Sequence, residues 1–237
     1  MIRFKERSTE NELMDDLSLD EVQIKAILKD ITVANRWLGG NQITINALDR
    51  MMASHPKKIY TIMDMGCGDG SMLREVASQC KKKGVEVRLI GLDLNSKSIK
   101  IARELSTSFP DISYLQKDVF SLKPEEFECD ILLCTLTLHH FSLQEIRTFV
   151  KKFAVLTNIG VIINDLDRSK IAYALFKVFS KVVIKTAVAR HDGLVSIMSG
   201  FTKNDFNEFA KSVPEMSSEV TWRWAFRYEW TLRHQNT

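Results

Sequence analysis

The chain has 237 residues, 45% of them apolar, and a formal net charge of +3. This length and composition fit one α/β domain with an added lid, and the small net charge argues against a dedicated nucleic-acid-binding surface. The first residues are charged, and the most apolar stretch, residues 171–188, is broken by three lysines. Neither a signal peptide nor a membrane span is therefore predicted. The four cysteines form no CxxC pair, so we expect reduced thiols in a cytoplasmic protein.

The first quarter of the chain predicts two helices. Apolar residues recur at helical intervals between residues 13 and 31, residues 35–40 interrupt the pattern, and a second helix is expected over 42–52. We divide the single domain into an N-terminal helical lid (1–55), a cofactor-binding core (56–165), a substrate cover (166–214) and a C-terminal β-hairpin (215–237).

Strands and helices alternate in the core, which is typical of a parallel sheet covered on both faces. Strands are expected at 59–63, 87–92, 112–115, 130–134 and 160–164, and helices at 71–83, 96–108 and 143–156. Between residues 220 and 230 apolar and polar residues alternate strictly, which indicates an antiparallel, half-buried strand or hairpin. The sequence thus predicts an α/β fold with a mixed sheet.

The strongest motif is Asp64-Met65-Gly66-Cys67-Gly68-Asp69-Gly70, between the first core strand and its helix. Open α/β sheets bind ligands at this edge, and glycines there allow a tight turn and close approach of the backbone. A dinucleotide fingerprint would place a third glycine where Ser71 stands. The acid at Asp64 suits an ammonium-bearing ligand better than a phosphate, so the loop favours S-adenosylmethionine over a nicotinamide cofactor.

Acidic residues also follow the next two strands. Asp93 is placed to accept both ribose hydroxyls of an adenosine, as acids do in dinucleotide folds. Asp118 could accept from the adenine amino group, while the backbone N–H of a neighbour such as Val119 pairs with a ring nitrogen. The predicted cofactor site also includes neighbours of the loop and of the strand ends, namely Cys67, Leu94 and Thr135.

Residues 59–165 resemble class I S-adenosylmethionine-dependent methyltransferases through the DxGxGxG loop, Gly91-Leu92-Asp93, Lys117-Asp118-Val119 and Leu138-His139-His140-Phe141. They are most similar to small-molecule enzymes such as those of quinone biosynthesis. Residues 35–40 and 190–196 resemble segments of bacterial methyltransferases of polyketide-type pathways. The resemblance implies a doubly wound, Rossmann-like, seven-stranded sheet with an antiparallel last strand, S-adenosylmethionine as cofactor, and methyl transfer to a small molecule. No Asn/Asp-Pro-Pro-Tyr/Phe motif follows the fourth strand, which disfavours amide or adenine methylation.

Histidines are the candidate catalytic residues. A phenol acceptor has a pKa of roughly 10, so a nearby base would help its methylation at neutral pH. His139 and His140 follow the fourth strand and could supply that base, or could pack in the core and shape the donor pocket. His191 beside Asp192 could pair a base with an orienting acid, or lie in a loop that turns at Gly193.

Arg36 could bind the donor's carboxylate from the lid, or be an ordinary surface residue. We expect no metal, because the histidines show no zinc-ligand spacing with Cys67 or Cys80.

Residues 171–185 form an apolar helix in which Lys177, Lys181 and Lys185 fall four residues apart. We hypothesise that it lines a pocket for an apolar acceptor, with the lysines facing water, an acidic carrier protein or a membrane surface. A core helix with a solvated edge is the alternative.

The leading functional hypothesis is methylation of oxygen, or less favourably carbon, on an aromatic, quinone-like or polyketide-like acceptor. A protein that binds S-adenosylmethionine without methyl transfer, an RNA methyltransferase and a nicotinamide oxidoreductase are the alternatives. No nucleic-acid partner is expected, because the basic residues are scattered.

Overall fold

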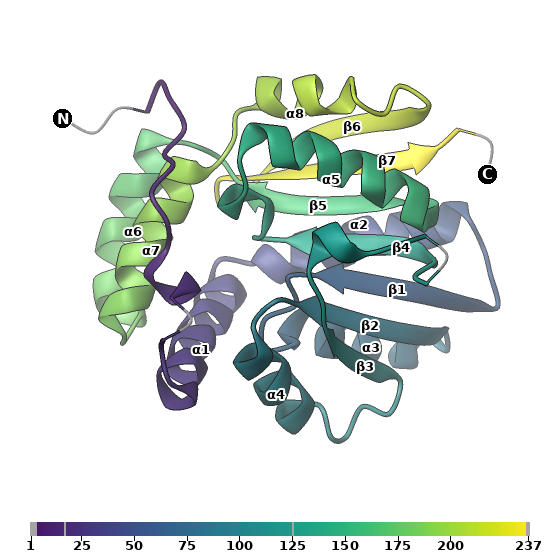
Figure 1. The fold of residues 1–237 in the computed structure, drawn as a ribbon, viewed down its shortest axis with the longest axis horizontal. Helices are drawn as coiled ribbons and strands as arrows, with labels where there is room; N and C mark the ends of the chain where they lie inside the picture. Colours follow the sequence, from purple (N-terminus) through teal and green to yellow (C-terminus); the bar gives the residue numbers. More distant parts are fainter. Residues whose placement is uncertain (1–3, 17, 125, 236–237) are drawn as a thin grey trace.

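The computed structural model describes residues 4–16, 18–124 and 126–235; the predicted segment limits at residues 1 and 237 lie outside this part. Seven strands of the described chain form one sheet in the order β3-β2-β1-β4-β5-β7-β6 (Figure 1). They are β1 (Ile59–Met65), β2 (Glu86–Asp93), β3 (Ile112–Gln116), β4 (Cys129–Thr135), β5 (Thr157–Leu166), β6 (Met216–Arg223) and β7 (Arg227–His234). The first five run parallel, and β7 is antiparallel to both β5 and β6. The predicted seven-stranded mixed sheet with an antiparallel last strand is confirmed.

The helices are α1 (Glu21–Trp37), α2 (Gly40–Ser54), α3 (Ser71–Lys83), α4 (Ser96–Leu105), α5 (Leu143–Leu156), α6 (Lys170–Val183), α7 (Ala187–Ser199) and α8 (Lys203–Ala210), with short 3-10 turns η1 (Leu13–Asp15), η2 (Val119–Ser121) and η3 (Leu138–His140). Local signals set their ends. Gly84 adopts a left-handed conformation that terminates α3. Ser142 and Glu145 form a reciprocal capping box at the start of α5.

Two apolar cores sandwich the sheet. On one face α5 and α8 contribute rings such as Phe149 and Phe206, which pack with Trp230 of β7. On the other face α3 and α4 pack on β2 and β3, and α2 packs on β5 and β7, with Leu73 and Ile62 fully buried. Because both faces are covered, β4 and β5 are continuous apolar runs rather than alternating ones. Each such buried side chain stabilises the fold by about 1.5 to 3 kcal/mol.

The C-terminal hairpin does not show the predicted alternation of burial, because the polar Arg227 and Glu229 of β7 are buried. Trp230 in β7 is fully buried, and its indole N–H donates to Ser218 Oγ at 2.9 Å. Trp222 in β6 is half-exposed because β6 is the edge strand of the sheet. The predicted hairpin is confirmed, and its period-two pattern runs through the turn between the strands.

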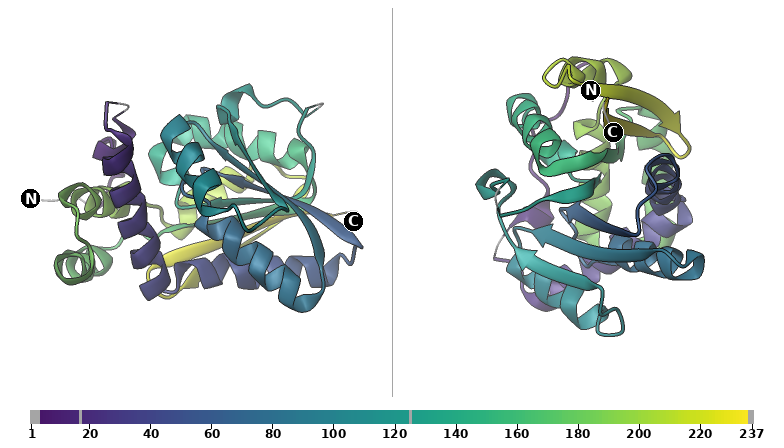
Figure 2. Two further views of the ribbon diagram at one scale, coloured as in Figure 1. Left: turned by 90° about the horizontal axis from the view of Figure 1, so that it is seen from below. Right: turned by 90° about the vertical axis from the view of Figure 1, so that its right-hand side faces the viewer.

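A second helical layer lies beyond the carboxyl ends of the parallel strands. α1, α6 and α7 stand together at that edge, with the N-terminal segment running across them (Figures 1 and 2). Asp30 of α1 accepts the backbone N–H groups of Lys185 and Thr186 at 3.0 and 2.7 Å, which ties α1 to the connection between α6 and α7. This layer covers the edge where ligands bind.

Two local predictions in this layer are wrong. Residues 35–37 continue α1 rather than interrupting it, and residues 190–193 lie inside α7 rather than in a loop. A Cβ on Gly193 would lie 2.3 Å from Cζ of Phe176 in α6. Glycine at 193 therefore allows two helices to pack closely, and it makes no turn.

Helix α6 presents apolar side chains to solvent. Ile171, Val178 and Val182 are 63%, 68% and 84% exposed, while Phe176 and Phe179 pack inward with α1 and α7. The alternative of a core helix with a solvated edge is therefore wrong. Within the described residues, no helix combines the length and apolar character needed to cross a membrane.

Candidate active site

The glycine loop joins β1 to α3 with an unusual backbone. Gly66, Gly68 and Gly70 all have positive φ angles, 73°, 52° and 74°. The N–H groups of Gly66 and Cys67 donate to the carbonyl of Leu92 at 2.9 and 3.0 Å, which fixes the loop against the end of β2. A Cβ on Gly66 would lie 2.5 Å from Thr137 Cγ2 and Oγ1, so only glycine fits there.

Asp93 sits at the carboxyl end of β2 and organises the loop. Its Oδ2 accepts the N–H of Gly68 at 2.9 Å, and its Oδ1 accepts that of Asn95 at 2.8 Å. Each carboxylate oxygen keeps a second lone pair, so Asp93 can still accept from ribose hydroxyls. Leu94 and Phe120 expose apolar surface after β2 and β3, where an adenine ring would find apolar contact. These residues fit an adenosine group.

Asp64 is buried at the start of the loop. Burial, with a smaller contribution from the charge of Asp93, raises the pKa of Asp64 to about 8. Burial raises the free energy of the ionised Asp64 carboxylate, and a nearby cationic ligand would lower it again. The site therefore suits a donor that carries an ammonium or sulfonium group.

Helix α1 lies directly over this loop. Cδ2 of Leu28 would be 3.4 Å from a Cβ on Gly68. Thr32 Oγ1 donates to Asp69 Oδ2 at 3.1 Å. These contacts place a helix of the predicted lid against the predicted cofactor loop.

Of the remaining predicted cofactor residues, one lies beside the glycine loop and others are exposed to solvent. The hydroxyl of Thr135 is hydrogen-bonded to that of Thr44 in α2, at 3.1 Å, beside the loop. Asp118 is exposed, and its Oδ1 accepts the N–H of Phe120 at 2.8 Å, while half-buried Val119 follows it in η2. Arg36 is exposed in the last turn of α1, and its guanidinium makes no hydrogen bond or ion pair with any described residue. A role for Arg36 stays a prediction.

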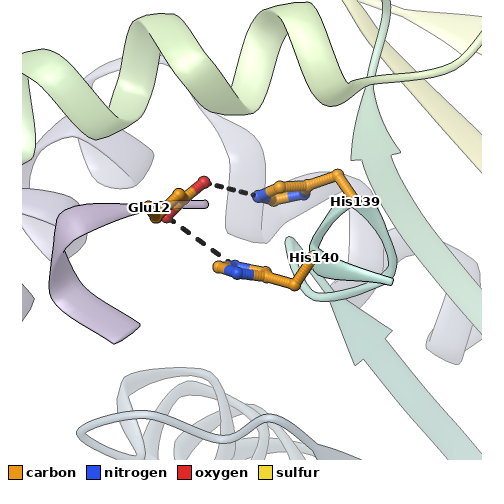
Figure 3. Close-up of side chains that lie close together, drawn as sticks. All are labelled: Glu12, His139 and His140. Carbon is orange, nitrogen blue, oxygen red and sulfur yellow. Dashed lines mark ion pairs between the residues drawn. The ribbon is translucent and has the colours of Figure 1, made fainter. Parts of the chain in front are cut away.

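His139 is held between two carboxylates. Its Nδ1 donates to Asp165 Oδ1 at 2.7 Å, and its Nε2 lies 3.2 Å from Glu12 Oε1 (Figure 3). Burial alone would lower the pKa of His139, but the charges and hydrogen bonds of Asp165 and Glu12 raise it to about 10. His139 is therefore an imidazolium at neutral pH and does not serve as a free base.

His140 stacks on His139, with ring centroids 4.5 Å apart. Its Nδ1 donates to Asp15 Oδ2 at 3.1 Å, and its Nε2 lies 3.8 Å from Glu12 Oε2. His140 is partly exposed, so it is the more accessible of the two histidines.

The N-terminal segment, residues 7–16, is fixed across η3. The guanidinium of Arg7 donates to the carbonyls of His139, Phe141 and Ser199. Asp192 in α7 accepts the backbone N–H groups of residues 13 and 14, both at 2.9 Å. His191 Nδ1 lies 3.1 Å from Asp192 Oδ1, so the predicted pair forms, but it faces the N-terminal segment.

A buried polar group at the ends of β5 and β7 was not among the sequence predictions. Asn164 donates from Nδ2 to the Gly40 carbonyl at 2.8 Å, and Arg227 donates from Nη2 to Asn35 Oδ1 at 2.7 Å. Four buried polar atoms of this group have no hydrogen-bond partner among the described residues: Asn164 Oδ1, Asp165 Oδ2, and Nε and Nη1 of Arg227. Burial lowers the pKa of Arg227 to about 10, so its guanidinium is charged at neutral pH. Asp165 ends a strand and could have been found by the rule that found Asp93, whereas Arg227 and Glu12 carry no local signal.

Comparison with known proteins assigns this geometry. Residues 62–160, from β1 to β5, match the family model described as a methyltransferase domain. This segment is therefore similar to methyltransferase domains. The predicted resemblance and the predicted cofactor are confirmed.

Two curated proteins are similar to parts of this chain. A 2-phytyl-1,4-naphtoquinone methyltransferase from Thermosynechococcus vestitus is 33% identical over 70 residues, which are 29% of this chain and 30% of that protein. A carboxy-S-adenosyl-L-methionine synthase from Wolinella succinogenes is 28% identical over 108 residues, 45% of this chain and 41% of that protein. The chain thus matches less than half the length of either relative.

Solved methyltransferase structures share the whole fold. The plantazolicin methyltransferase BpumL with bound SAH aligns with a TM-score of 0.62 at 12% identity, covering 93% of this chain and 90% of that one. Magnesium protoporphyrin IX methyltransferase from Synechocystis PCC 6803 aligns with a TM-score of 0.59 at 15% identity, covering 92% and 89%. At such low identity these likenesses extend the fold assignment beyond residues 62–160 and say nothing of the acceptor.

Proposed function

We propose that this chain methylates an oxygen atom of an aromatic, quinone-like or polyketide-like small molecule. The observation that carries the proposal is Arg227, a buried cation with two unpartnered N–H groups beside Asn164 and Asp165. A buried donor set of this kind is costly unless it receives an acceptor atom. An anionic oxygen, such as a phenolate or a carboxylate, is the chemical partner that it fits.

The residues of the chain have distinct roles in this proposal. Bound S-adenosylmethionine supplies a methyl group already activated for in-line displacement. Asp93 and the glycine loop would hold its adenosine part, and its positive charge would favour the ionised form of the nearby Asp64. The guanidinium of Arg227 stabilises the acceptor as its oxyanion, which replaces the need for His139 as a base. Helix α1 over the loop excludes water from the reacting atoms.

The lid and the substrate cover belong to the same proposal. Residues 1–55 act as the lid, and residues 166–214, which include α6 and α7, cover the acceptor. The exposed apolar stripe of α6 and its lysines suit an apolar or carrier-linked acceptor. The name of one similar protein, a 2-phytyl-1,4-naphtoquinone methyltransferase, supports a quinone-like acceptor. A cytoplasmic location stays a prediction.

Calorimetric titration with S-adenosylmethionine, S-adenosylhomocysteine and NADH tests the donor half. We expect the first two to bind, NADH not to bind, and the Asp93→Ala variant to lose binding. A screen of phenols and quinols, with methylated product identified by mass spectrometry, tests the acceptor half. Donor binding with no methylated product would favour a protein that binds S-adenosylmethionine without methyl transfer. Strongly salt-dependent RNA binding would favour an RNA methyltransferase instead.

The Arg227→Met variant tests the residue that carries the proposal. We expect kcat to fall by about 100-fold, as for removal of one oxyanion donor, with little change in donor affinity. The rate should also reach its maximum at higher pH, since the phenolate is less stabilised. Arg227→Lys should recover part of the rate, and the exposed Arg88→Met is the matched control. An unchanged rate in Arg227→Met would remove Arg227 from the mechanism.

A further inference from the structure

Three side chains from distant parts of the sequence converge beside η3. Glu12 comes from the N-terminal segment, and His139 and His140 come from η3 (Figure 3). One ligand atom from each lies within 4.8 Å of the others. Glu12 Oε1 is 3.2 Å from His139 Nε2, and Oε2 is 3.8 Å from His140 Nε2.

Both imidazole rings are oriented by a second carboxylate. Asp165 holds Nδ1 of His139 at 2.7 Å, and Asp15 holds Nδ1 of His140 at 3.1 Å. With each Nδ1 occupied, both Nε2 atoms face Glu12 (Figure 3). Metal-binding histidines are oriented in this way, with the nitrogen that does not bind metal donating to a carboxylate or carbonyl.

The charge around the three residues is negative. The carboxylates of Glu12, Asp15 and Asp165 all lie against the two histidines. The neighbouring cation Arg7 directs its donors to the backbone carbonyls of His139, Phe141 and Ser199 instead. Glu12 and Asp165 are buried with the charged ring of His139 between them, so a Zn²⁺ ion that displaces the Nε2 proton of His139 would take over the balance of these two carboxylates.

We propose that Glu12, His139 and His140 bind one Zn²⁺ ion through a carboxylate oxygen and the two Nε2 atoms. Two imidazoles and a carboxylate are the protein ligands of zinc sites that keep a fourth position open. Zinc–ligand bonds of about 2.0 to 2.2 Å in a tetrahedron place ligand atoms roughly 3.3 Å apart. The observed 3.2 Å to Oε1 and 3.8 Å to Oε2 involve different oxygens of Glu12, so side-chain rotations must bring one oxygen and both Nε2 atoms from separations of up to 4.8 Å to that geometry.

The site also has an entry path. A cavity of about 230 Å³ is lined by the three ligands together with Arg7, Asp15 and Glu145. The fourth metal position can therefore take water or one oxygen of a small molecule; that second role rests on the proposed function. The sequence predicted no metal because the histidines lack zinc-ligand spacing with a cysteine. In the fold, a glutamate of the N-terminal segment lies beside them instead.

Metal binding can be measured without any methyl-transfer assay. The protein, free of any affinity tag and dialysed against EDTA, is titrated with Zn²⁺ by calorimetry and with Co²⁺ by visible absorption. We expect one equivalent per chain, with the intense d–d bands of tetrahedral Co²⁺. His140→Ala and Glu12→Gln should each weaken binding by about 100-fold, and Asp15→Asn, which removes an orienting carboxylate, by about tenfold. His55→Ala, a histidine outside the cavity, should bind as the parent does.

Two results would overturn the proposal. One is the absence of saturable binding by the parent protein, and the other is equal affinity in the parent, His140→Ala and Glu12→Gln. His140 is partly exposed, so its variant should fold, and thermal melting checks this for each protein. A failed acceptor screen with intact metal binding would refute the proposed function alone. Methylated product with no metal binding would refute the metal site alone.

Discussion

Replacing Gly66 with alanine puts two demands of the cofactor loop to the test. The first is the positive φ of 73°, which costs an L-residue about 1 to 2 kcal/mol. The second is steric, because the new Cβ would lie 2.5 Å from Cγ2 and Oγ1 of Thr137. Overpacking of this kind costs a further 1 to 3 kcal/mol, roughly. Gly66→Ala should therefore lower the free energy of unfolding by about 2 to 5 kcal/mol.

Gly84→Ala provides the matched control. Gly84 has a φ of 67°, and nothing lies within 4 Å of its Cβ position. Its substitution should cost only the backbone part, about 1 to 2 kcal/mol. Urea unfolding measures both losses, and calorimetric titration measures donor affinity. We expect donor affinity to fall by about tenfold or more in Gly66→Ala, the equivalent of roughly 1.4 kcal/mol, and to be unchanged in Gly84→Ala.

Adding Thr137→Ala isolates the steric part. Thr137→Ala removes both atoms that a Cβ at position 66 would meet at 2.5 Å. In a double-mutant cycle, the two substitutions should therefore be less destabilising together than their sum, by about 1 to 3 kcal/mol. Equal losses in Gly66→Ala and Gly84→Ala, with additive effects in the cycle, would refute the assignment of Gly66 to a crowded loop.

Two further variants test the buried acid Asp64 and the exposed lysines of α6. Asp64 has a pKa of about 8 in the folded chain against an ordinary value of 3.8, so the unfolded chain releases this proton first as pH rises. Its contribution to stability should decrease between pH 4 and 8 by roughly 1.4 kcal/mol per pH unit; Asp64→Asn should flatten the urea-derived profile by that slope, and parallel profiles would contradict the assignment. Lys177→Glu combined with Lys181→Glu should slow turnover of a carrier-linked acceptor but not of the free acceptor. The same charge change at exposed Lys81 and Lys82 is its control, and equal rates for both pairs would remove the carrier hypothesis.

The donor half of the site could be predicted from local sequence. The glycine loop, Asp93 and Asp118 each follow a strand directly, and parallel strands bring their carboxyl ends to one edge. The acceptor half could be predicted only in part. His139 was found because it follows β4, but its state is set by Asp165 and Glu12, which reach it from β5 and the N-terminal segment.

Errors in the outer helices have a common physical cause. The predicted loop at residues 190–193 rested on polar residues and a glycine, which often mark turns. In α7 these residues meet specific partners, since Asp192 accepts backbone N–H groups of the N-terminal segment and Gly193 makes room for Phe176. Helix packing outweighed the local preference, and no pattern within the segment reveals those partners.

The sequence by itself determined the alternation of strands and helices, the antiparallel hairpin and the donor loop. These features depend on periodicity and on glycines within a few residues, where local sterics and burial act directly. Only the tertiary structure decided what surrounds His139 and His140 and which groups stay buried without partners. Those properties arise where Glu12, Asp165 and Arg227 meet across the end of the sheet. Contacts between residues so distant along the chain are fixed by the packing of the whole core rather than by any local pattern.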